Sequence, residues 1–141
     1  MTERPGLVTI IVPVYYSQDT LEPLVDRLIK VFRQRTEECE ILLVNDGSKD
    51  DSLEKIIEAY ELEKVNYYFD YRLPCNRIKS VYKSQNRSFK KLTVIDKVNG
   101  GKADSLNAGL NVSKNDLVVS IDADSIMESD ALLKMVKPFL E

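Results

Sequence analysis

Three short apolar runs, none of which contains a charged residue, restrict the fold of this chain more than any other feature. They cover residues 8–12, 41–44 and 117–121. Strands that are apolar on both faces are typical of parallel sheets, because helices cover such sheets from both sides. The sequence therefore predicts an α/β fold, a mostly parallel sheet with helices on both faces and right-handed crossovers.

Segments with helical periodicity separate the apolar runs. Apolar residues recur at helical spacing from position 21 to position 32, with charged residues on the opposite face, which predicts an amphipathic helix. Further helices are predicted at residues 53–60, from Lys102 onward and after Ser129, and a short strand at residues 92–96. The predicted inward-facing residues of the four helices are Leu21, Leu24, Val25, Leu28, Ile29, Phe32, Leu53, Ile56, Ile57, Tyr60, Ala103, Leu106, Leu110, Leu132, Leu133, Val136 and Leu140.

The composition fits one domain that spans residues 1–141, with 43% hydrophobic and 30% charged residues. A net charge of −3 disfavours nucleic acid as the main partner. No apolar run approaches the roughly 20 residues that span a bilayer, so the chain as given is not expected to cross a membrane. Cys39 and Cys75 are too few for a disulfide framework and predict a reduced, cytosolic-side protein.

Asp122 and Asp124 follow the last apolar run, one residue apart. In an extended chain both carboxylates lie on the same side and can face one ligand. The chain contains no histidine, so carboxylate oxygen is the obvious ligand for a metal here, and such ligands suit Mg²⁺ or Mn²⁺. The alternative is that the pair only turns the chain and caps the next helix.

The other predicted parallel strands end at the same edge of the sheet. The first is followed by Pro13, Val14 and Tyr15, and the second by Asp46 within a turn-forming segment. Ligands of open α/β sheets bind outside the carboxyl ends of the strands. We therefore expect these residues to share a crevice with Asp122 and Asp124.

Two glycines and a lysine, Gly100, Gly101 and Lys102, precede the third predicted helix. Glycines at a helix start allow backbone N–H groups to approach an anion, and the lysine adds a positive charge. The spacing is not that of a Walker loop. A simple entry into the helix is the alternative.

Seven cations and no acid occur between residues 72 and 91, where the periodicity fails. Such a local basic excess could hold phosphate or face acidic lipid or a partner surface. The alternative is a solvated excursion or hairpin whose Lys and Arg residues guard an edge strand.

Four segments taken in order resemble the donor-binding half of a family-2 inverting glycosyltransferase with the Rossmann-like GT-A fold. The segments are residues 12–15, 45–48, 101–109 and 122–124. Residues 96–110 look most like the processive membrane synthases of the poly-N-acetylglucosamine, cellulose and hyaluronan type. The resemblance covers nearly the whole chain and implies the N-terminal part of a longer catalytic domain that binds a nucleotide-diphosphosugar.

The resemblance assigns the nucleoside of a UDP-sugar donor to two side chains. Tyr15, with Pro13 and Val14 behind it, corresponds to the platform that packs against uracil. Asp46 corresponds to the carboxylate that accepts the uracil imide N–H. An aromatic face with one acceptor is a reasonable way to select a pyrimidine.

The resemblance also assigns the rest of the donor. Lys102 corresponds to a lysine that approaches the nucleotide phosphates. Asp122 and Asp124 match an Asp-x-Asp motif, in which the first contacts the ribose or sugar and the second coordinates Mg²⁺ or Mn²⁺. The metal would neutralise charge on the departing UDP during inverting hexosyl transfer to a growing glycan.

Two family features are missing from this sequence. The general base and the Gln-x-x-Arg-Trp motif lie further along in such synthases, and this chain contains no Trp. The chain is therefore either an N-terminal piece of a larger enzyme or a naturally short donor-binding protein. It is expected to bind donor without efficient transfer, with the glycan acceptor bound by the missing region. The parent protein is expected at the cytoplasmic face of the cell membrane, embedded through helices that this chain lacks.

Three other functions remain open at this point. A nucleotidyltransferase would carry a glycine-rich loop after the first strand, and residues 13–16 contain no glycine. A non-catalytic nucleotide-binding module could use the basic segment for membrane or partner contact. A receiver-like phosphoacceptor domain would need a lysine after a late strand, which is not apparent.

Overall fold

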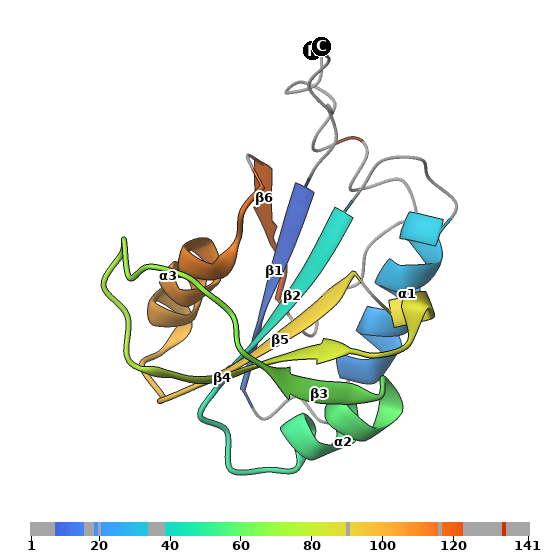
Figure 1. Ribbon diagram of the computed structural model, residues 1–141, viewed down its shortest axis with the longest axis horizontal. Coiled ribbons are helices and arrows are strands. Elements are labelled where there is room, and N and C mark those ends of the chain that lie inside the picture. Colours follow the sequence, from blue (N-terminus) through green and yellow to red (C-terminus); the bar gives the residue numbers. More distant parts are fainter. Residues whose placement is uncertain are drawn as a thin grey trace.

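The computed structural model describes residues 8–15, 19, 21–33, 39–89, 91–115, 117–122 and 134. Within these residues the chain forms strands and helices in an alternating order that is interrupted once (Figure 1). The elements are β1 (Val8–Val14), α1 (Leu21–Arg33), β2 (Cys39–Asp46), α2 (Ser52–Ala59), β3 (Leu62–Val65), β4 (Ile78–Ser84), the 3₁₀ turn η1 (Arg87–Phe89), β5 (Leu92–Lys97), α3 (Lys102–Val112) and β6 (Leu117–Ser120).

The strands form one six-stranded sheet with the order β3-β4-β5-β2-β1-β6. Strands β5, β2, β1 and β6 run parallel, whereas β4 pairs antiparallel with both β3 and β5. Helices α1 and α2 lie on one side of the sheet and α3 on the other (Figure 1). The predicted fold class, a mostly parallel sheet with helices on both faces, is confirmed.

Alternation along the strands divides the core into two layers. On β1, Ile10 faces the layer under α1 and α2, and its neighbour Ile11 faces the layer under α3. Both side chains are fully buried. Helix α1 contributes Leu24, Val25 and Leu28 to the first layer. Burial on both faces explains why the parallel strands are apolar at nearly every position.

Strands β3 and β4 are the part of the sheet that the sequence left undefined. Strand β4 is internal, with β3 at the edge; a register shift lies between Ile78 and Ser80, and the burial pattern stops alternating after Val81. Lys83 of β4 donates a hydrogen bond to Thr93 on β5, 2.9 Å away. The basic segment therefore contains a strand that pairs on both sides, so its Lys and Arg residues do not guard an edge strand as the alternative above expected. Residues 66–77 form a long connection that packs beside α3.

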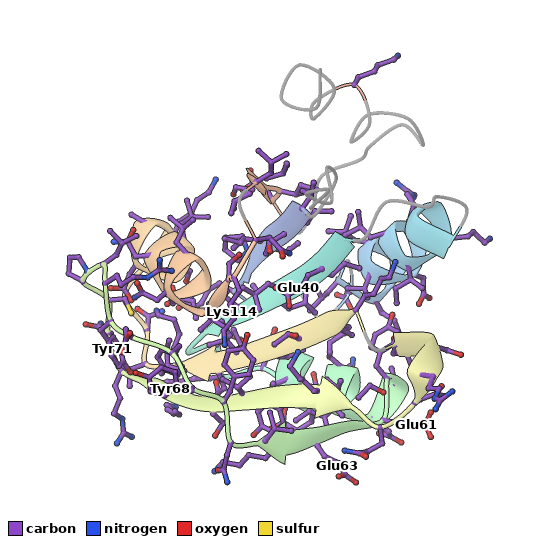
Figure 2. The ribbon with its side chains drawn as sticks, turned by 45° about the horizontal axis from the view of Figure 1, so that its top comes forward. Glu40, Glu61, Glu63, Tyr68, Tyr71 and Lys114 are labelled. Carbon is purple, nitrogen blue, oxygen red and sulfur yellow. The ribbon has the colours of Figure 1, made fainter. Side chains whose placement is uncertain are left out.

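The connection at residues 66–77 is attached to α3 by hydrogen bonds. The Asn111 side chain bonds the backbone N–H and carbonyl of Leu73 at 2.8 and 2.9 Å. Arg72 donates to the carbonyl oxygen of Leu110 at 3.0 Å. Tyr68 and Tyr71 of this connection are exposed (Figure 2), and the Tyr71 hydroxyl accepts the backbone N–H of Ile78 on β4 at 3.0 Å. Arg72, which the sequence showed only as part of a basic segment, therefore helps to attach this connection to α3.

The helix expected after Ser129 lies outside the described residues, except for Lys134, which is helical. Within the described residues, no helix combines the length and apolarity needed to cross a bilayer.

The order of the strands places a switch point between β1 and β6. After β1 the chain builds the sheet toward β2 and β5, and it later returns to the other side of β1 with β6. Loops that leave neighbouring strands in opposite directions open a crevice at such a point. The backbone N–H of Ile121, just beyond β6, bonds the carbonyl oxygen of Ile11 at 3.0 Å and holds the end of β6 against the middle of β1.

Candidate functional site

The carboxyl edge of the parallel strands brings together four of the residues selected from the sequence. Tyr15 follows β1, Asp46 ends β2, Lys102 opens α3, and Asp122 lies two residues after β6. Tyr15 is 53% exposed, whereas Val14 is 2% exposed and belongs to the core beneath α1. Val14 therefore supports the strand end from inside, and Tyr15 is the exposed residue of the two.

Asp46 is buried, and its carboxylate is surrounded by donors. Its Oδ1 pairs with the ammonium of Lys97 and accepts the N–H of Gly100 at 2.9 Å. Its Oδ2 accepts the N–H of Gly101 at 2.9 Å and the Asn99 side-chain amide at 3.4 Å. The same Asn99 amide also donates to the Asp46 carbonyl oxygen at 2.7 Å. Asp46 thus anchors the loop between β5 and α3 to the end of β2.

The backbone N–H groups of the glycines in this loop bind the Asp46 carboxylate. The sequence indicated that the N–H groups of Gly100 and Gly101 could approach a phosphate, but in the structure both donate to Asp46. Gly101 has φ +93°, a conformation that side chains rarely adopt. Gly47, with φ +67°, lies so close to Asn99 that a Cβ would come within 2.8 Å of it. The two loops are therefore fitted against each other by glycine.

Lys97 and Asp104 are functional candidates that the sequence did not reveal. The Lys97 ammonium lies 2.7 Å from Asp104 Oδ2, and Asp104 also accepts the N–H of Asn76 at 2.9 Å. Lys97 ends an apolar strand and appears from the sequence to be only a charged residue leaving the sheet. Its partner Asp46 lies 51 positions earlier, so local spacing carried no signal of the pair.

Lys102 and Asp122 form an ion pair at the switch point. Lys102 Nζ lies 2.6 Å from Asp122 Oδ1, with 60% and 54% of the two side chains exposed. Exposed ion pairs contribute about 0 to 1 kcal/mol, so this pair can open at little cost when a ligand arrives. A cation already lies beside the first carboxylate of the Asp-x-Asp motif.

The second carboxylate of the motif, Asp124, lies outside the described residues. Among the residues that are described, no group of three or more acidic, cysteine or histidine side chains could hold a metal ion. The one motif carboxylate described, Asp122, offers exposed oxygen ligands of the kind that Mg²⁺ or Mn²⁺ prefers. Burial raises the pKa of the Cys75 thiol, which disfavours the thiolate form that binds softer metals.

These features of the sheet edge define a class of protein. A parallel α/β sheet with an exposed aromatic ring, a lysine and an aspartate at its switch point is a nucleotide-binding type of architecture. The sequence model of glycosyl transferase family 2 matches residues 9–141. The chain belongs to glycosyl transferase family 2.

Two curated relatives show the range of the family around this chain. It is 30% identical over 122 residues to undecaprenyl-phosphate 4-deoxy-4-formamido-L-arabinose transferase of Proteus mirabilis, covering 86% of this chain and 30% of that protein. It is 30% identical over 132 residues to poly-beta-1,6-N-acetyl-D-glucosamine synthase of Staphylococcus aureus, covering 94% and 25%. The expected resemblance to such synthases is confirmed, and the chain spans less than a third of either relative.

Solved structures agree on the fold. The mannosyltransferase PcManGT from Pyrobaculum calidifontis, in complex with GDP-Man and Mn²⁺, superposes with a TM-score of 0.69 at 23% identity, covering 99% of this chain and 34% of that one. Staphylococcus aureus TarS 1–349, in complex with UDP-GlcNAc, gives a TM-score of 0.61 at 21% identity, covering 92% and 30%. These structures establish the GT-A fold predicted from the sequence.

Proposed function

We propose that this chain is the donor-binding region of a glycosyltransferase that transfers a hexosyl unit from a UDP-sugar to a growing glycan with inversion. The observation that carries the proposal is the ion pair of Lys102 and Asp122 at the edge of a family-2 sheet where Tyr15 also follows its strand. The structural neighbours support it, because one was solved with UDP-GlcNAc and another with a nucleotide-sugar and Mn²⁺.

We assign the uracil to the exposed ring of Tyr15, supported by Pro13 and the buried Val14. In this proposal Asp46 accepts the uracil imide N–H. Because both Asp46 oxygens already have partners, one must exchange a bond, and Oδ2, whose second donor is 3.4 Å away, is the better candidate. Base selection is then coupled to the position of the β5–α3 loop.

The pyrophosphate is assigned to the other half of the edge. Lys102 opens α3, so its ammonium and the helix N-terminus both favour a negative group there. Asp122 and Asp124 would hold Mg²⁺ or Mn²⁺, which would supply charge neutralisation for the leaving UDP. The exposed Lys102–Asp122 pair keeps the aspartate ready for a cation while no ligand is bound.

The wider setting is part of the same proposal. The synthase relative favours a growing glycan as acceptor, bound outside this region. The transferase relative is named for undecaprenyl phosphate, which makes a lipid phosphate the competing acceptor. Both names fit a parent protein embedded in the cell membrane with this region at the cytoplasmic face.

The test is calorimetric titration of UDP into the purified chain, first with Mn²⁺ and then with EDTA, with GDP as the matched nucleotide. The proposal predicts binding that is tighter with metal and selective for UDP. Tighter binding of GDP than of UDP would show that the site takes guanine rather than the assigned uracil. No binding to a chain whose circular dichroism shows the α/β fold would favour a non-catalytic module, for which the exposed Tyr68 and Tyr71 offer a contact surface (Figure 2).

A further inference from the structure

A fully buried lysine lies between two carboxylates beneath the β5–α3 loop. Lys97 has no exposed surface. Its ammonium pairs with Asp46 Oδ1 and, at 2.7 Å, with Asp104 Oδ2. The side chains of Asp46 and Asp104 are only 6% and 17% exposed. One buried positive charge is therefore paired with two carboxylates that are themselves largely shielded from water.

The two carboxylates connect this ammonium to four segments of the chain. Asp46 ends β2 and holds the N–H groups of Gly100 and Gly101. Asp104 lies in the first turn of α3 and accepts the N–H of Asn76 from the 66–77 connection. Asn76 then donates its side-chain amide to the Asn99 carbonyl oxygen at 2.7 Å, which closes the network around the loop.

Lys102 lies within this network although it belongs to the exposed edge. It directly follows Gly101, which is bound to Asp46, and it precedes Asp104 by two residues. The direction in which Lys102 leaves the backbone is thus set on both sides by groups that contact Lys97. Shifting either carboxylate would move the start of α3.

We propose that Lys97 is a positioning residue of the donor site. By holding Asp46 and Asp104 together, it fixes the β5–α3 loop so that Lys102 reaches Asp122 and the donor phosphates, and so that Asp46 Oδ2 stays beside the base. This inference rests on the proposed function, because it concerns the donor bound at the same edge.

The energetics of buried charges favour such a role over a purely structural one. A buried ion pair is often no more stabilising than apolar side chains of similar volume, because desolvation offsets the attraction. Stability alone would therefore be served by apolar side chains at all three positions, 46, 97 and 104, whereas an apolar residue at 97 alone would leave two buried carboxylates unpaired. What an apolar cluster would not do is hold the backbone N–H groups of Gly100, Gly101 and Asn76 in place.

The experiment compares four variants of the chain with the parent sequence. Lys97→Met removes the ammonium, and Lys97→Met combined with Asp104→Asn also removes one of the carboxylates that would otherwise repel. Lys97→Arg keeps the charge. Val112→Ala is the control, because it opens the core at the opposite end of the same helix, away from the loop.

Three quantities are measured: the melting temperature, the Kd for UDP with Mn²⁺ and with EDTA, and the hydrogen exchange of the Gly100 and Gly101 amides by NMR. We expect the double variant to bind UDP roughly 10- to 100-fold more weakly under both conditions, as is usual when supporting contacts of a site are lost. The two glycine amides should exchange faster. Lys97→Arg should restore most of the affinity, and Val112→Ala should lower only the melting temperature.

Parental UDP affinity in a double variant that is as stable as Val112→Ala would overturn the inference while leaving the proposed function intact. If the parent chain binds no UDP, the proposed function fails instead. The glycine amides then still report on Lys97, since unchanged exchange in the double variant would show that the lysine does not hold the loop.

Discussion

Tyr60, the residue that follows α2, joins this helix to α1 through its hydroxyl group. The hydroxyl donates to Asp26 Oδ1 at 2.6 Å, and the ring meets Phe89 edge to face. Burial and the bond to Asp26 raise the pKa of Tyr60, so the phenol stays protonated and remains a donor at any physiological pH.

Replacing Tyr60 by phenylalanine keeps the ring and removes this bond together with the longer bond of the same hydroxyl to the Glu22 carbonyl oxygen at 3.4 Å. We expect Tyr60→Phe to lower the free energy of unfolding by about 1 kcal/mol, because the shorter hydrogen bond accounts for most of the loss and the ring stays packed. Urea denaturation measures it. Tyr68→Phe is the control: its hydroxyl bonds Asp70 at 3.3 Å on a side chain that is 78% exposed, so no measurable change is expected. Equal losses in the two variants would assign the effect to something other than the α1–α2 contact.

Asp124 provides a second prediction at the level of single residues, based on the proposed function. We expect Asp124→Ala to abolish the strengthening of UDP binding by Mn²⁺ and to leave the weaker binding in EDTA, because Tyr15 and Asp46 do not depend on the metal. Calorimetry with and without metal measures both. Asp70→Ala, which removes an exposed carboxylate from another segment, should change neither. Equal loss under the two conditions would contradict the assignment of Asp124 to the metal.

Among the elements, helix α3 packs unusually close to β1. A Cβ added at Gly109 would lie 2.8 Å from the Cδ1 and Cγ2 atoms of Ile11. We expect Gly109→Ala to lower the free energy of unfolding by about 1–2 kcal/mol, because overpacking costs about 1–3 kcal/mol and better helix propensity returns up to about 1. Thermal or urea unfolding measures the change.

A double-mutant cycle with Ile11→Val tests the cause of that loss. Ile11→Val alone should cost about 0.5–1.5 kcal/mol, and it removes Cδ1, one of the two atoms in the way. The double variant should therefore be more stable than the sum of the single effects predicts. Simple additivity would mean that the helix accommodates the methyl group by shifting.

Elements differ in how far the sequence could predict them. The parallel strands and α1 could be predicted because burial on two faces, or on one helical stripe, leaves a pattern within a single segment. Strands β3 and β4 could not, since β3 is only four residues long and burial in β4 does not alternate after Val81, where Lys83 is half-buried.

The topology of parallel strands predicted that Tyr15, Asp46 and Asp122 lie at one edge. Lys102 was instead selected from the glycines before its helix and from the family resemblance. Lys97 was not predicted, because its meaning depends on partners that folding brings near.

At the scale of the whole molecule, a polar cluster lies on the α3 side of the sheet, toward the amino ends of β1 and β2. Glu40 accepts a hydrogen bond from Thr9 at 3.3 Å and interacts with the charges of Lys83 and Lys114. Figure 2 shows Glu40 and Lys114 near each other. Both lysines also lie over the ring of Tyr67, at 5.4 and 4.8 Å from its centre. Burial raises the pKa of Glu40, although the two lysines and Thr9 oppose it.

A raised pKa in the folded state means that folded chains bind a proton that unfolded chains have already released. The stability linked to Glu40 is therefore complete below the pKa of the unfolded chain and is lost as the pH rises through the folded pKa. We expect Glu40→Gln to be more stable than the parent at pH 7 and equal to it at pH 4, below the ordinary glutamate pKa of about 4.3. Melting temperatures across this range measure it. A constant difference would show that Glu40 titrates alike in folded and unfolded chains, and a less stable variant at pH 7 would show that the lysines dominate; either result contradicts the prediction.

The place of β1 between β2 and β6 also governs the order in which the molecule can assemble. The hydroxyl of Ser113 meets that of Thr9 across 104 positions of sequence, and β6 lies further along still. During synthesis, β1 leaves the ribosome long before β6, and one edge of β1 stays unpaired until β6 has been synthesised. Parallel pairing over such separations makes folding slow, and an unpaired apolar strand invites association with other chains. A nascent chain of this protein should depend on chaperones until the sixth strand emerges.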